Sequence, residues 1–568
     1  MHLEQQLIDQ VNDWLNQDPD LATKKDLTEL LDAAIKNEGS ALIELTDAFR
    51  APLEFGTAGL RGALGPGPNR MNRVTVLQAV GGLVEYLKNE GFIGKKVVIG
   101  FDARYNSDVF ARDSAEVLAG NGFIPILFDH VVPTPVLAFA IRNLNACAGI
   151  MVTASHNPPQ DNGYKVYLGD GRQIVPPADV EISAEIRKIK DVRKLLRSDE
   201  IEIAPNTCEI EYVNSVNKLI SQGPVTAEQK VNVKTVYTAM HGVGWETLAK
   251  VFTACGFTMP IAVVEQRDPD PAFPTVNFPN PEEKGALDLG IEKAIEQNAD
   301  LLLANDPDAD RLAVALPTTT GNWKMLRGDQ VGVLLGWWIS ERAKLADKKL
   351  SGTLASSIVS SMMLEAVATT EGFKYEHTLT GFKWVSRVPN LIYGYEEALG
   401  YCVDPVSVGD KDGISAAAMF VELVTYLKAQ NKSLWQQLDD LALEHGLYVS
   451  DQVSVRVNDL TVVPQVMNAL RVNPPKNFGS MTVSSILDLA KPESGLPPTD
   501  GVIFYLTGND QVEKGRVIVR PSGTEPKIKC YLEVVVKVTD LIQGQDLADQ
   551  ELVAIANDAK PLLQVNVN

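Results

Sequence analysis

The feature that most constrains the fold is a regular alternation of short apolar runs with helical segments through the first three quarters of the chain. Lys96–Gly100, Ile124–Phe128 and Gly149–Val152 have the length and composition of buried strands. Ala111–Leu118 and Pro135–Leu144, which lie between them, have the spacing of helices. A strand followed by a helix and a second strand forms a parallel pair with a right-handed crossover. The pattern therefore predicts α/β domains with parallel strand pairs.

The same alternation returns further along the chain. The second round is expected to contain strands at Val233–Tyr237, Ile261–Val264 and Leu301–Leu303 and helices at Trp245–Cys255 and near Ala286–Gln297. A third and fainter round begins near Ser351, with a strand, a serine-rich loop and a helix in Thr353–Ala368.

The last segment has a different pattern, because strands follow one another with few helices between them. It predicts a small α+β domain. At ~150 residues per domain, 568 residues correspond to about four domains. We expect the four domains at residues 1–205, 206–325, 326–446 and 447–568. The strands expected in the last one are Val453–Val457, Val502–Leu506, Arg516–Val519 and Ile528–Val536.

The composition is that of an ordinary folded protein, with 45% hydrophobic and 22% charged residues. The net charge of −21, from 52 basic and 73 acidic residues, argues against nucleic acid or an anionic membrane as a partner. An anionic substrate would have to be held by local clusters of cationic side chains and backbone N–H groups. The sequence leaves open whether the protein is a monomer or a dimer.

Several features predict a protein of the cytoplasm. The N-terminal segment, with Glu4, Asp9 and Asp13, is typical of an acidic amphipathic helix and not of a secretion signal. The apolar run Val331–Ile339 is much shorter than the ~20 residues of a membrane span. The cysteines are odd in number and widely spaced, which predicts reduced thiols and no zinc knuckle. They are Cys147, Cys208, Cys255, Cys402 and Cys530.

Three aspartates stand at alternate positions directly after the last strand of the second round. They are Asp306, Asp308 and Asp310, and Arg311 follows immediately. A strand that ends in this turn brings three carboxylates together, and a divalent cation such as Mg²⁺ relieves their repulsion. An EF-hand is excluded, because the sixth position of the loop would be Arg311 instead of Gly and the twelfth would be Pro317 instead of Glu. The alternative is a solvated acidic turn.

A second polar loop, TASHNPP, follows the strand that ends at Val152. Loops beyond the carboxyl ends of strands form the binding crevice of an open α/β sheet, so Ser155 is a candidate nucleophile. Adjacent side chains on a strand diverge, so His156 is not expected to act as a direct base for Ser155. Lys165, in the downstream sequence NGYK, could contact an anion. The absence of a Gly-x-Ser-x-Gly elbow argues against a serine hydrolase, and the alternative is an ordinary capped turn.

The sequence RPSGTEP joins two expected strands of the last domain. Gly523 lets the backbone approach a ligand closely, and Arg520, Ser522 and Thr524 supply donors that suit a phosphate. This density of donors favours an anion site over a simple hairpin turn.

Three other stretches carry weaker signals. GYEEALG contains the paired acids Glu396 and Glu397, which could accept hydrogen bonds from hydroxyl groups. GDKDG places Lys411 among acids, where it could act as a general acid or base. The glycine-rich GTAGLRG, which includes Arg61, lacks the spacing of a nucleotide-binding loop. The alternative for the glutamate pair is a solvated surface position, and the alternative for GDKDG is an ordinary turn.

Taken together, these motifs resemble those of one family, the α-D-phosphohexomutases of the phosphoglucomutase/phosphomannomutase superfamily. TASHNPP with NGYK, DPDADR, GYEEALG and RPSGTEP occur in the family order, and the resemblance runs from about residue 50 almost to the C-terminus. It implies three related α/β domains with mixed sheets and a C-terminal α+β domain like the TATA-binding protein, arranged around a central cleft.

The resemblance implies phosphoryl transfer at the first two motifs. Ser155 would carry a phosphoryl group, and Mg²⁺ would lie between it and Asp306, Asp308 and Asp310. Arg311 would steady the same group. A sugar bisphosphate would be the intermediate that turns end over end, and glucose 1,6-bisphosphate would prime the enzyme.

Further roles follow from the same resemblance. His156 and Lys411 are the candidates for proton transfer, and Lys165 and Arg61 would assist at the phosphoryl site. The residues that would bind the sugar phosphate are Arg520, Ser522, Gly523 and Thr524 for the distal phosphate, Glu396 for the sugar hydroxyls, and Thr380, Gly381 and Lys383 for the orientation of the sugar.

One position departs from many relatives. Ala398 stands where they have a serine two residues after the sugar-binding Glu396, and a missing hydroxyl donor weakens discrimination among sugars. The N-terminal helix, GTAGLRG, TLTGFKWV and GYEEALG look most like the subgroup of bacterial phosphoglucomutases and animal mutases that also accept pentose phosphates. We expect glucose 1-phosphate to glucose 6-phosphate as the main reaction, with phosphomannomutase and phosphopentomutase activity as alternatives.

Two other classes of protein share parts of this pattern. A Mg²⁺-dependent phosphatase of the haloacid dehalogenase type would use Asp306 as its nucleophile and leave TASHNPP and RPSGTEP without a role. A non-catalytic sugar-phosphate-binding protein would have no need of a phosphorylatable Ser155.

Overall fold

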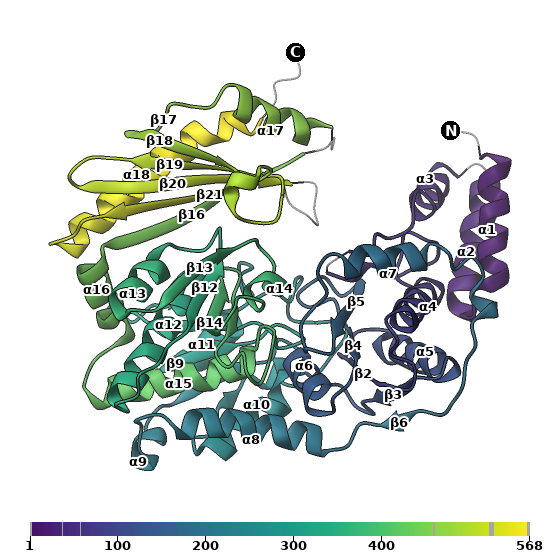
Figure 1. Ribbon diagram of the computed structural model, residues 1–568, viewed down its shortest axis with the longest axis horizontal. Coiled ribbons are helices and arrows are strands. Elements are labelled where there is room, and N and C mark those ends of the chain that lie inside the picture. Colours follow the sequence, from purple (N-terminus) through teal and green to yellow (C-terminus); the bar gives the residue numbers. More distant parts are fainter. Residues whose placement is uncertain (1–2, 37, 57, 458–460, 522–526, 565–568) are drawn as a thin grey trace. The chain divides into compact units, whose positions relative to one another are not determined.

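The protein divides into two compact units, and each is described by itself. The computed structural model describes residues 3–36, 38–56, 58–457, 461–521 and 527–564 (Figure 1). The first unit comprises residues 1–326 and 399–425, and the second comprises residues 327–398 and 426–568.

The first sheet of the first unit is mixed. Its six strands lie in the order β1 (Leu60–Ala63), β5 (Asp161–Leu168), β4 (Ala148–Val152), β2 (Lys96–Phe101), β3 (Ile124–Leu127) and β6 (Glu202–Ile203). The expected parallel pairing is confirmed for β2 with β3 and with β4. The alternation of strands and helices did not predict β5, which runs antiparallel to β4 and to β1 and makes the sheet mixed. A short turn suffices to join antiparallel strands, so β4 and β5 need no helix between them.

Helices lie on both faces of this sheet, because successive residues of its buried strands point to opposite sides. Val97 and Ile99 of β2 share a core with Phe110. Gly100 faces Leu137, and a side chain at Gly100 would come within 3.0 Å of that leucine. The helices on this sheet are α4 (Arg73–Asn89), α5 (Ser107–Gly120), α6 (Thr134–Asn143) and α7 (Ala178–Ile186).

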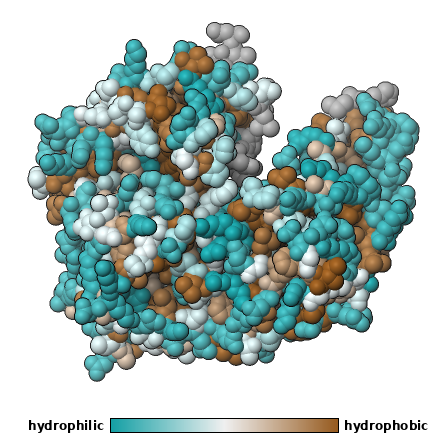
Figure 2. All heavy atoms as spheres, in the orientation of Figure 1, coloured by the Kyte–Doolittle hydropathy of each residue, from teal (hydrophilic) through white to brown (hydrophobic). Residues whose placement is uncertain are grey.

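Three helices precede the first sheet. They are α1 (Gln5–Gln17), α2 (Leu21–Ile35) and α3 (Gly39–Ala48). The expected acidic amphipathic helix corresponds to α1, whose Val11 and Trp14 join the core of the first sheet. Figure 2 shows mainly hydrophilic residues on the outer side of α1. Asp20 caps the N-terminus of α2 by accepting a hydrogen bond from the backbone N–H of Ala22 at 2.8 Å.

The second sheet of the first unit carries the aspartate turn. Its strands lie in the order β11 (Trp323–Met325), β10 (Ala313–Pro317), β9 (Leu301–Ala304), β7 (Thr235–Thr238) and β8 (Ile261–Ala262). β7 is parallel to β8 and β9, as expected, whereas β10 is antiparallel to β9 and β11. β9 is fully buried, in agreement with its apolar sequence. The helices of this part are α8 (Thr207–Ser221), α9 (Ala227–Lys230), α10 (Gly244–Cys255) and α11 (Asp288–Glu296).

The second unit begins with a parallel arrangement. β12 (Thr353–Ser357) pairs in parallel with β13 (Lys374–Thr378) and β14 (Leu391–Glu396), which is the expected third round of alternation. The helix α12 (Gly328–Leu345) lies close to β14, and a side chain at Gly332 would come within 2.3 Å of the Tyr395 ring. The remaining helices of this unit are α13 (Met363–Glu371), α14 (Phe382–Val385) and α16 (Leu434–His445). The strand β15 (Gly400–Cys402) and most of the helix α15 (Gly413–Ala429) belong to the first unit.

The C-terminal sheet has neighbouring strands in antiparallel pairs, as the strand-rich pattern predicts. Its order is β16 (Leu447–Arg456), β21 (Lys527–Val536), β20 (Val512–Pro521), β19 (Val502–Thr507), β18 (Met481–Asp488) and β17 (Asn477–Phe478). One face packs against α17 (Val462–Val472) and α18 (Leu541–Leu562). Residues of the other face, such as Ile518 and Tyr531, pack with Ile358 and Val359 of the same unit.

Within the described part of the chain, none of the helices has both the length and the apolar character that crossing a bilayer requires. The cysteines Cys147, Cys208, Cys255, Cys402 and Cys530 are all free and buried. Burial raises the pKa of Cys147 to about 11 and the pKa of Cys255 and Cys530 to about 12.

These thiols should be unreactive in the folded protein, because a thiolate is the nucleophile and burial suppresses it. We expect a disulfide reagent such as 5,5′-dithiobis(2-nitrobenzoic acid) at pH 8 to modify none of the cysteines in the native protein. In guanidinium chloride all five should react. Fast modification of any one thiol in the native protein would contradict this packing.

Candidate active site

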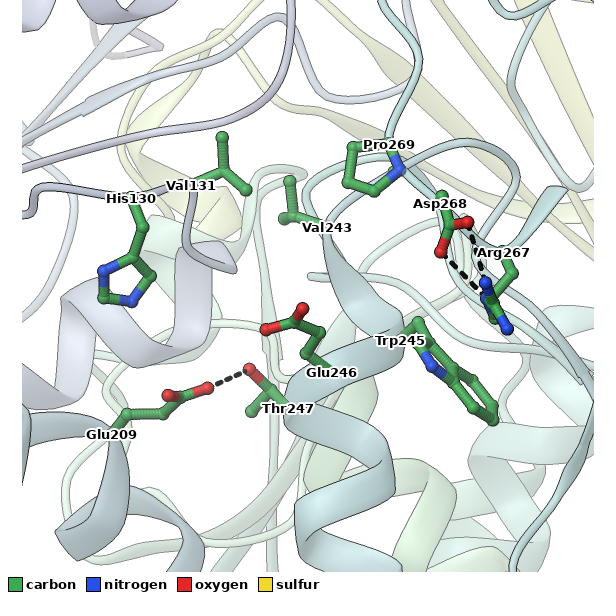
Figure 3. Close-up of a pocket in the computed structure, with 11 residues that line it drawn as sticks. His130, Val131, Glu209, Val243, Trp245, Glu246, Thr247, Arg267, Asp268 and Pro269 are labelled. Carbon is green, nitrogen blue, oxygen red and sulfur yellow. Dashed lines mark hydrogen bonds and ion pairs between the residues drawn. The ribbon is translucent and has the colours of Figure 1, made fainter.

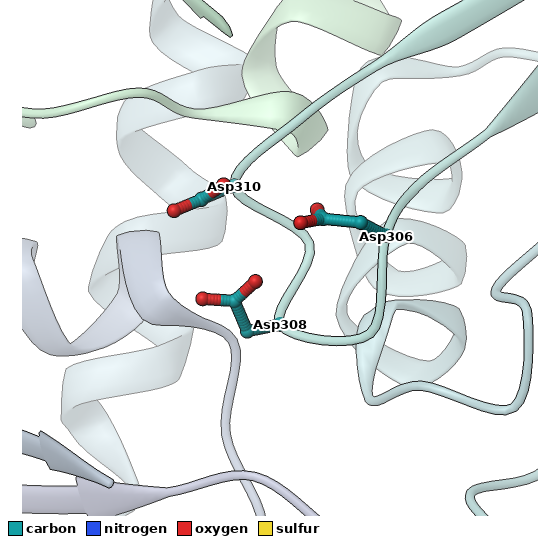
Figure 4. A group of neighbouring side chains, drawn as sticks. All are labelled: Asp306, Asp308 and Asp310. Atoms are coloured by element: carbon teal, nitrogen blue, oxygen red, sulfur yellow. The ribbon is translucent and has the colours of Figure 1, made fainter. Parts of the chain in front are cut away.

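The three aspartates form a buried cluster at the carboxyl end of β9. Asp306, Asp308 and Asp310 are fully buried, and each offers a carboxylate oxygen within 4.8 Å of the others (Figure 4). The turn is tight, since Ala309 adopts a left-handed φ of 57°. The backbone N–H of Arg311 donates to Oδ1 of Asp306 at 3.0 Å, which closes the turn.

Ser155 lies against this cluster. Its hydroxyl donates to Oδ2 of Asp306 at 2.7 Å, so the loop after β4 meets the loop after β9. Ser155 has a φ of 51°, a left-handed conformation that is uncommon for a residue with a side chain. Such strain is typical of residues held in place for a function.

The prediction that the side chains of Ser155 and His156 point away from each other is wrong. Nδ1 of His156 lies 3.2 Å from Oγ of Ser155. The residues lie in a turn after β4 and not on the strand, and the left-handed φ of Ser155 brings the two side chains to the same side. Burial lowers the pKa of His156 well below its usual value, and Arg311 and Arg61 add to that shift. The imidazole is therefore held in its neutral form.

Two lysines neutralise part of the carboxylate charge. Nζ of Lys165 lies 2.7 Å from Oδ2 of Asp308 and 2.9 Å from Oδ2 of Asp310, and Nζ of Lys411 lies 3.1 Å from the same oxygen of Asp310. Burial alone would raise the pKa of Asp310, but Lys165 and Lys411 hold it well below its usual value. Burial and the adjacent Asp308 and Asp310 raise the pKa of Asp306.

The cluster has oxygen atoms suited to a metal ion. No described residue donates a hydrogen bond to Oδ1 of Asp308 or to Oδ1 of Asp310, although both atoms are buried. The Oδ2 atoms of the same two carboxylates are fixed by the lysines, so their free oxygens have defined directions. Hard, closely spaced oxygen ligands suit Mg²⁺. The three aspartates could therefore hold a divalent cation next to Ser155.

Two arginines predicted from the sequence also lie here. Arg61, on β1, donates to Oδ1 of Asn157 in the serine loop at 3.1 Å. Burial lowers the pKa of Arg61, and the nearby Arg311 lowers it further. Nε of Arg311 is 3.9 Å from Asp306 and is buried with no hydrogen-bond partner among the described residues. An anion at this place would meet both guanidinium groups.

Sequence reasoning missed Arg104, which holds the serine loop. Its guanidinium donates to the backbone carbonyls of Ser155 at 2.7 Å and Asn157 at 2.6 Å. It also donates to those of Pro158 at 2.8 Å and Asp161 at 3.1 Å. These bonds fix the strained backbone of the loop.

Thr134 was also missed. Its hydroxyl donates to Oδ2 of Asp308 at 2.6 Å, and its backbone N–H donates to the Asp308 carbonyl at 2.9 Å. Arg104 follows β2 and Thr134 follows β3, so both lie beyond carboxyl ends of parallel strands. That position is the signal that could have identified them.

The remaining predicted residues lie in the second unit. Gly381 has a φ of 106°, and its backbone N–H donates to Oε1 of Glu396 at 2.6 Å, so the loop that contains Thr380 and Lys383 meets the acidic motif. Ala398 follows two residues later and has no polar side chain. Arg520 is near the end of β20, whereas the predicted Ser522, Gly523 and Thr524 lie outside the described residues.

A separate pocket of about 170 Å³ in the first unit contains none of the predicted residues (Figure 3). On its wall, the hydroxyl of Thr247 donates to Glu209 at 2.7 Å, and Arg267 pairs with the neighbouring Asp268 at 2.8 Å. Glu209, Arg267 and Asp268 thus each have a partner on the same wall.

Models of one family match most of the chain. Three models of the phosphoglucomutase/phosphomannomutase alpha/beta/alpha domains, I, II and III, match residues 52–193, 210–320 and 327–444. The model of the C-terminal domain of the same family matches residues 511–541.

Curated relatives agree with these matches. A probable phosphomannomutase of Haemophilus influenzae is 49% identical over 469 residues, which are 82% of this chain and 93% of that protein. The human phosphopentomutase is 39% identical over 565 residues, covering 92% of this chain and 90% of that protein. Among solved structures, the Paramecium phosphoglucomutase parafusin aligns with a TM-score of 0.68 at 19% identity, over 90% of this chain and 95% of the other.

The fold and these matches define an enzyme that transfers a phosphoryl group within its substrate, a phosphomutase. The chain belongs to the phosphoglucomutase/phosphomannomutase family. The resemblance inferred from the motifs is confirmed, and so are the three α/β domains with mixed sheets and the C-terminal domain.

The cluster predicts a specific loss of metal binding in the Asp308→Asn variant, which removes one charge without changing shape. We expect the affinity for Mg²⁺ to fall by about 100-fold or more, since even changes outside the ligand set cost about 10–100-fold. Calorimetry with Mg²⁺, or electron paramagnetic resonance with Mn²⁺, measures this directly. The matched control is Asp268→Asn at an exposed ion pair. Equal affinities in the two variants would rule out the site.

Proposed function

We propose that this enzyme interconverts glucose 1-phosphate and glucose 6-phosphate through a phosphoserine at Ser155 and glucose 1,6-bisphosphate. The observation that carries the proposal is the 2.7 Å contact between the Ser155 hydroxyl and Asp306, inside a cluster that also contains Asp308 and Asp310. A serine beside three buried carboxylates suits a phosphoryl carrier, because a bound Mg²⁺ would offset the charge that gathers there during transfer.

In the first half-reaction a sugar hydroxyl attacks the phosphorus on Ser155. A new P–O bond forms to the sugar, the P–Oγ bond to Ser155 breaks, and the proton of the hydroxyl passes to a base. Arg61 and Arg311 would offset negative charge on the transferring group. Oγ of Ser155 takes up a proton as the P–Oγ bond breaks, and His156, at 3.2 Å from Oγ, and Lys411 are the candidates for these two proton transfers. In the second half-reaction the bisphosphate presents its other phosphoryl group, and that group passes back to Ser155 by the reverse of these steps.

The second unit would bind the sugar and its distal phosphate. Glu396 would accept hydrogen bonds from the sugar hydroxyls, and the bond from Gly381 fixes its carboxylate at 2.6 Å. Thr380 and Lys383, on the same loop as Gly381, would contact the sugar and distinguish its two orientations. The distal phosphate is assigned to Arg520 together with Ser522, Gly523 and Thr524.

Ribose 1-phosphate is the second candidate substrate, and two observations favour it. Ala398 offers no hydroxyl donor to an epimer-specific sugar hydroxyl. The phosphopentomutase relative also matches over 92% of the chain. Mannose 1-phosphate is a third candidate, in line with the name of the Haemophilus relative.

The covalent step is tested with Ser155→Ala. We expect this variant to lose mutase activity with every sugar phosphate, because it removes the hydroxyl that donates to Asp306. Intact-mass measurement of the native enzyme after incubation with glucose 1,6-bisphosphate should show an adduct of ~80 Da that the variant lacks. The control is Ser114→Ala, which replaces a buried serine of helix α5 and should keep both activity and adduct. An active Ser155→Ala variant would favour an aspartyl phosphatase mechanism instead.

The substrate is tested by kcat/KM for glucose, mannose and ribose 1-phosphates with a trace of bisphosphate primer. We expect glucose 1-phosphate to be the best substrate, with the others within about 100-fold, since a site without a hydroxyl donor discriminates weakly. Ala398→Ser should widen these ratios. A large preference for ribose 1-phosphate in the native enzyme would overturn the glucose assignment.

A further inference from the structure

Glu397, next to the proposed sugar-binding Glu396, is held by two buried serines. The hydroxyls of Ser357 and Ser360 lie 3.0 Å and 3.1 Å from the same carboxylate oxygen, Oε2. The backbone N–H of Glu397 also donates to Oγ of Ser360 at 3.0 Å. Both serines have no exposed surface. Glu397 is thus fixed through its side chain and its backbone by one loop, residues 357–362.

That loop is itself fixed by the C-terminal sheet. Arg516 of β20 donates to the carbonyl of Ile358 at 3.0 Å and also to the carbonyl of Ser360. Glu533 of β21 accepts a hydrogen bond from the backbone N–H of Met362 at 3.0 Å. Arg516 and Glu533 form a buried ion pair of 2.8 Å, each only 3% exposed. A buried ion pair contributes little net stability, so its use here is to define the position of the loop.

A second set of contacts fixes the loop from α12. Oδ1 of Asp329 accepts hydrogen bonds from the backbone N–H of Ser361 at 2.7 Å and from the hydroxyl of Tyr395 at 2.9 Å. A side chain at Gly328 would come within 1.8 Å of the Glu397 carbonyl oxygen, so only glycine permits this approach of the helix. Burial raises the pKa of Glu397 to about 7, and Glu396 and Asp329 add to the shift, which is the signature of a tightly enclosed carboxyl group.

The two adjacent glutamates are therefore fixed by different partners. Gly381 holds the carboxylate of Glu396, and Ser357 and Ser360 hold that of Glu397. A displacement of the Glu397 backbone would move Glu396 and Ala398, its immediate neighbours. A binding group must stay within about 0.5 Å of its productive position to work well.

We propose that Ser357 and Ser360 are positioning residues for sugar binding, which hold Glu396 in place through Glu397 on a loop anchored by Arg516 and Glu533. The inference rests on the proposed function, because it assumes that Glu396 contacts the sugar. It assigns a task to this serine-rich loop, in which the hydroxyls of Ser357 and Ser360 both contact Glu397. It also gives the C-terminal sheet a role in sugar binding beyond the distal phosphate.

The test is the double variant Ser357→Ala/Ser360→Ala, assayed with whichever of glucose, mannose and ribose 1-phosphate has the highest kcat/KM. We expect KM to rise by about 10–100-fold, the usual effect of losing groups that orient a binding residue. The rate at which water removes the phosphoryl group from phospho-Ser155 should stay unchanged, because that step needs no sugar. Arg516→Lys should raise KM in the same direction, since lysine cannot donate to the carbonyls and Glu533 at once.

The matched control is Ser356→Ala, which removes a buried hydroxyl of the same strand that lies 2.7 Å from the Tyr375 hydroxyl and does not touch Glu397. It should leave KM at the native value. If the double variant does not fold, Ser360→Ala alone replaces it, with the urea midpoint confirming a native fold.

Three outcomes would overturn the inference: a native KM in the folded variant, an equal rise of KM in the control, or a parallel loss of phospho-Ser155 hydrolysis. These are distinct from a failure of the proposed function. In that case the native enzyme itself would show no mutase activity with any of the three sugar phosphates.

Discussion

The site depends on how three buried carboxylates are kept together. Asp306, Asp308 and Asp310 have no exposed surface and lie close enough to share one cation. Burial of several negative charges is strongly unfavourable unless each is paired. Lys165 pairs with Oδ2 of Asp308 and of Asp310, and Lys411 pairs with the same oxygen of Asp310. Among the residues that the structure describes, none donates a hydrogen bond to the opposite oxygens of these two carboxylates. The architecture of the first unit serves this arrangement, since its loops converge where β2, β3, β4 and β9 end.

Much of the fold was predictable from the sequence, for definite physical reasons. The buried strand β9 is a continuous apolar run, and the rhythm of strands and helices identified β2, β3 and β7 as well. β5 was not predictable as an antiparallel neighbour of β4, because pairing direction depends on the length of the connection and on tertiary contacts.

The site could be predicted only as far as its motifs extend. The aspartates, Ser155 and the lysines are recognisable by residue type and order. The approach of His156 to Ser155 depends on a left-handed backbone angle that the residue types do not reveal. Arg104 and Thr134 act on backbone carbonyls and on one carboxylate oxygen, and they lie far from the motifs in sequence. Only their positions after strand ends mark them.

A diffraction experiment on crystals grown with Mn²⁺ in place of Mg²⁺ tests the central claim most directly, because the anomalous signal locates the ion without reference to activity. The account predicts one strong peak coordinated by Asp306, Asp308 and Asp310 and by an oxygen on Ser155. A peak elsewhere, with the ammonium group of Lys165 filling the space between the free carboxylate oxygens, would contradict it.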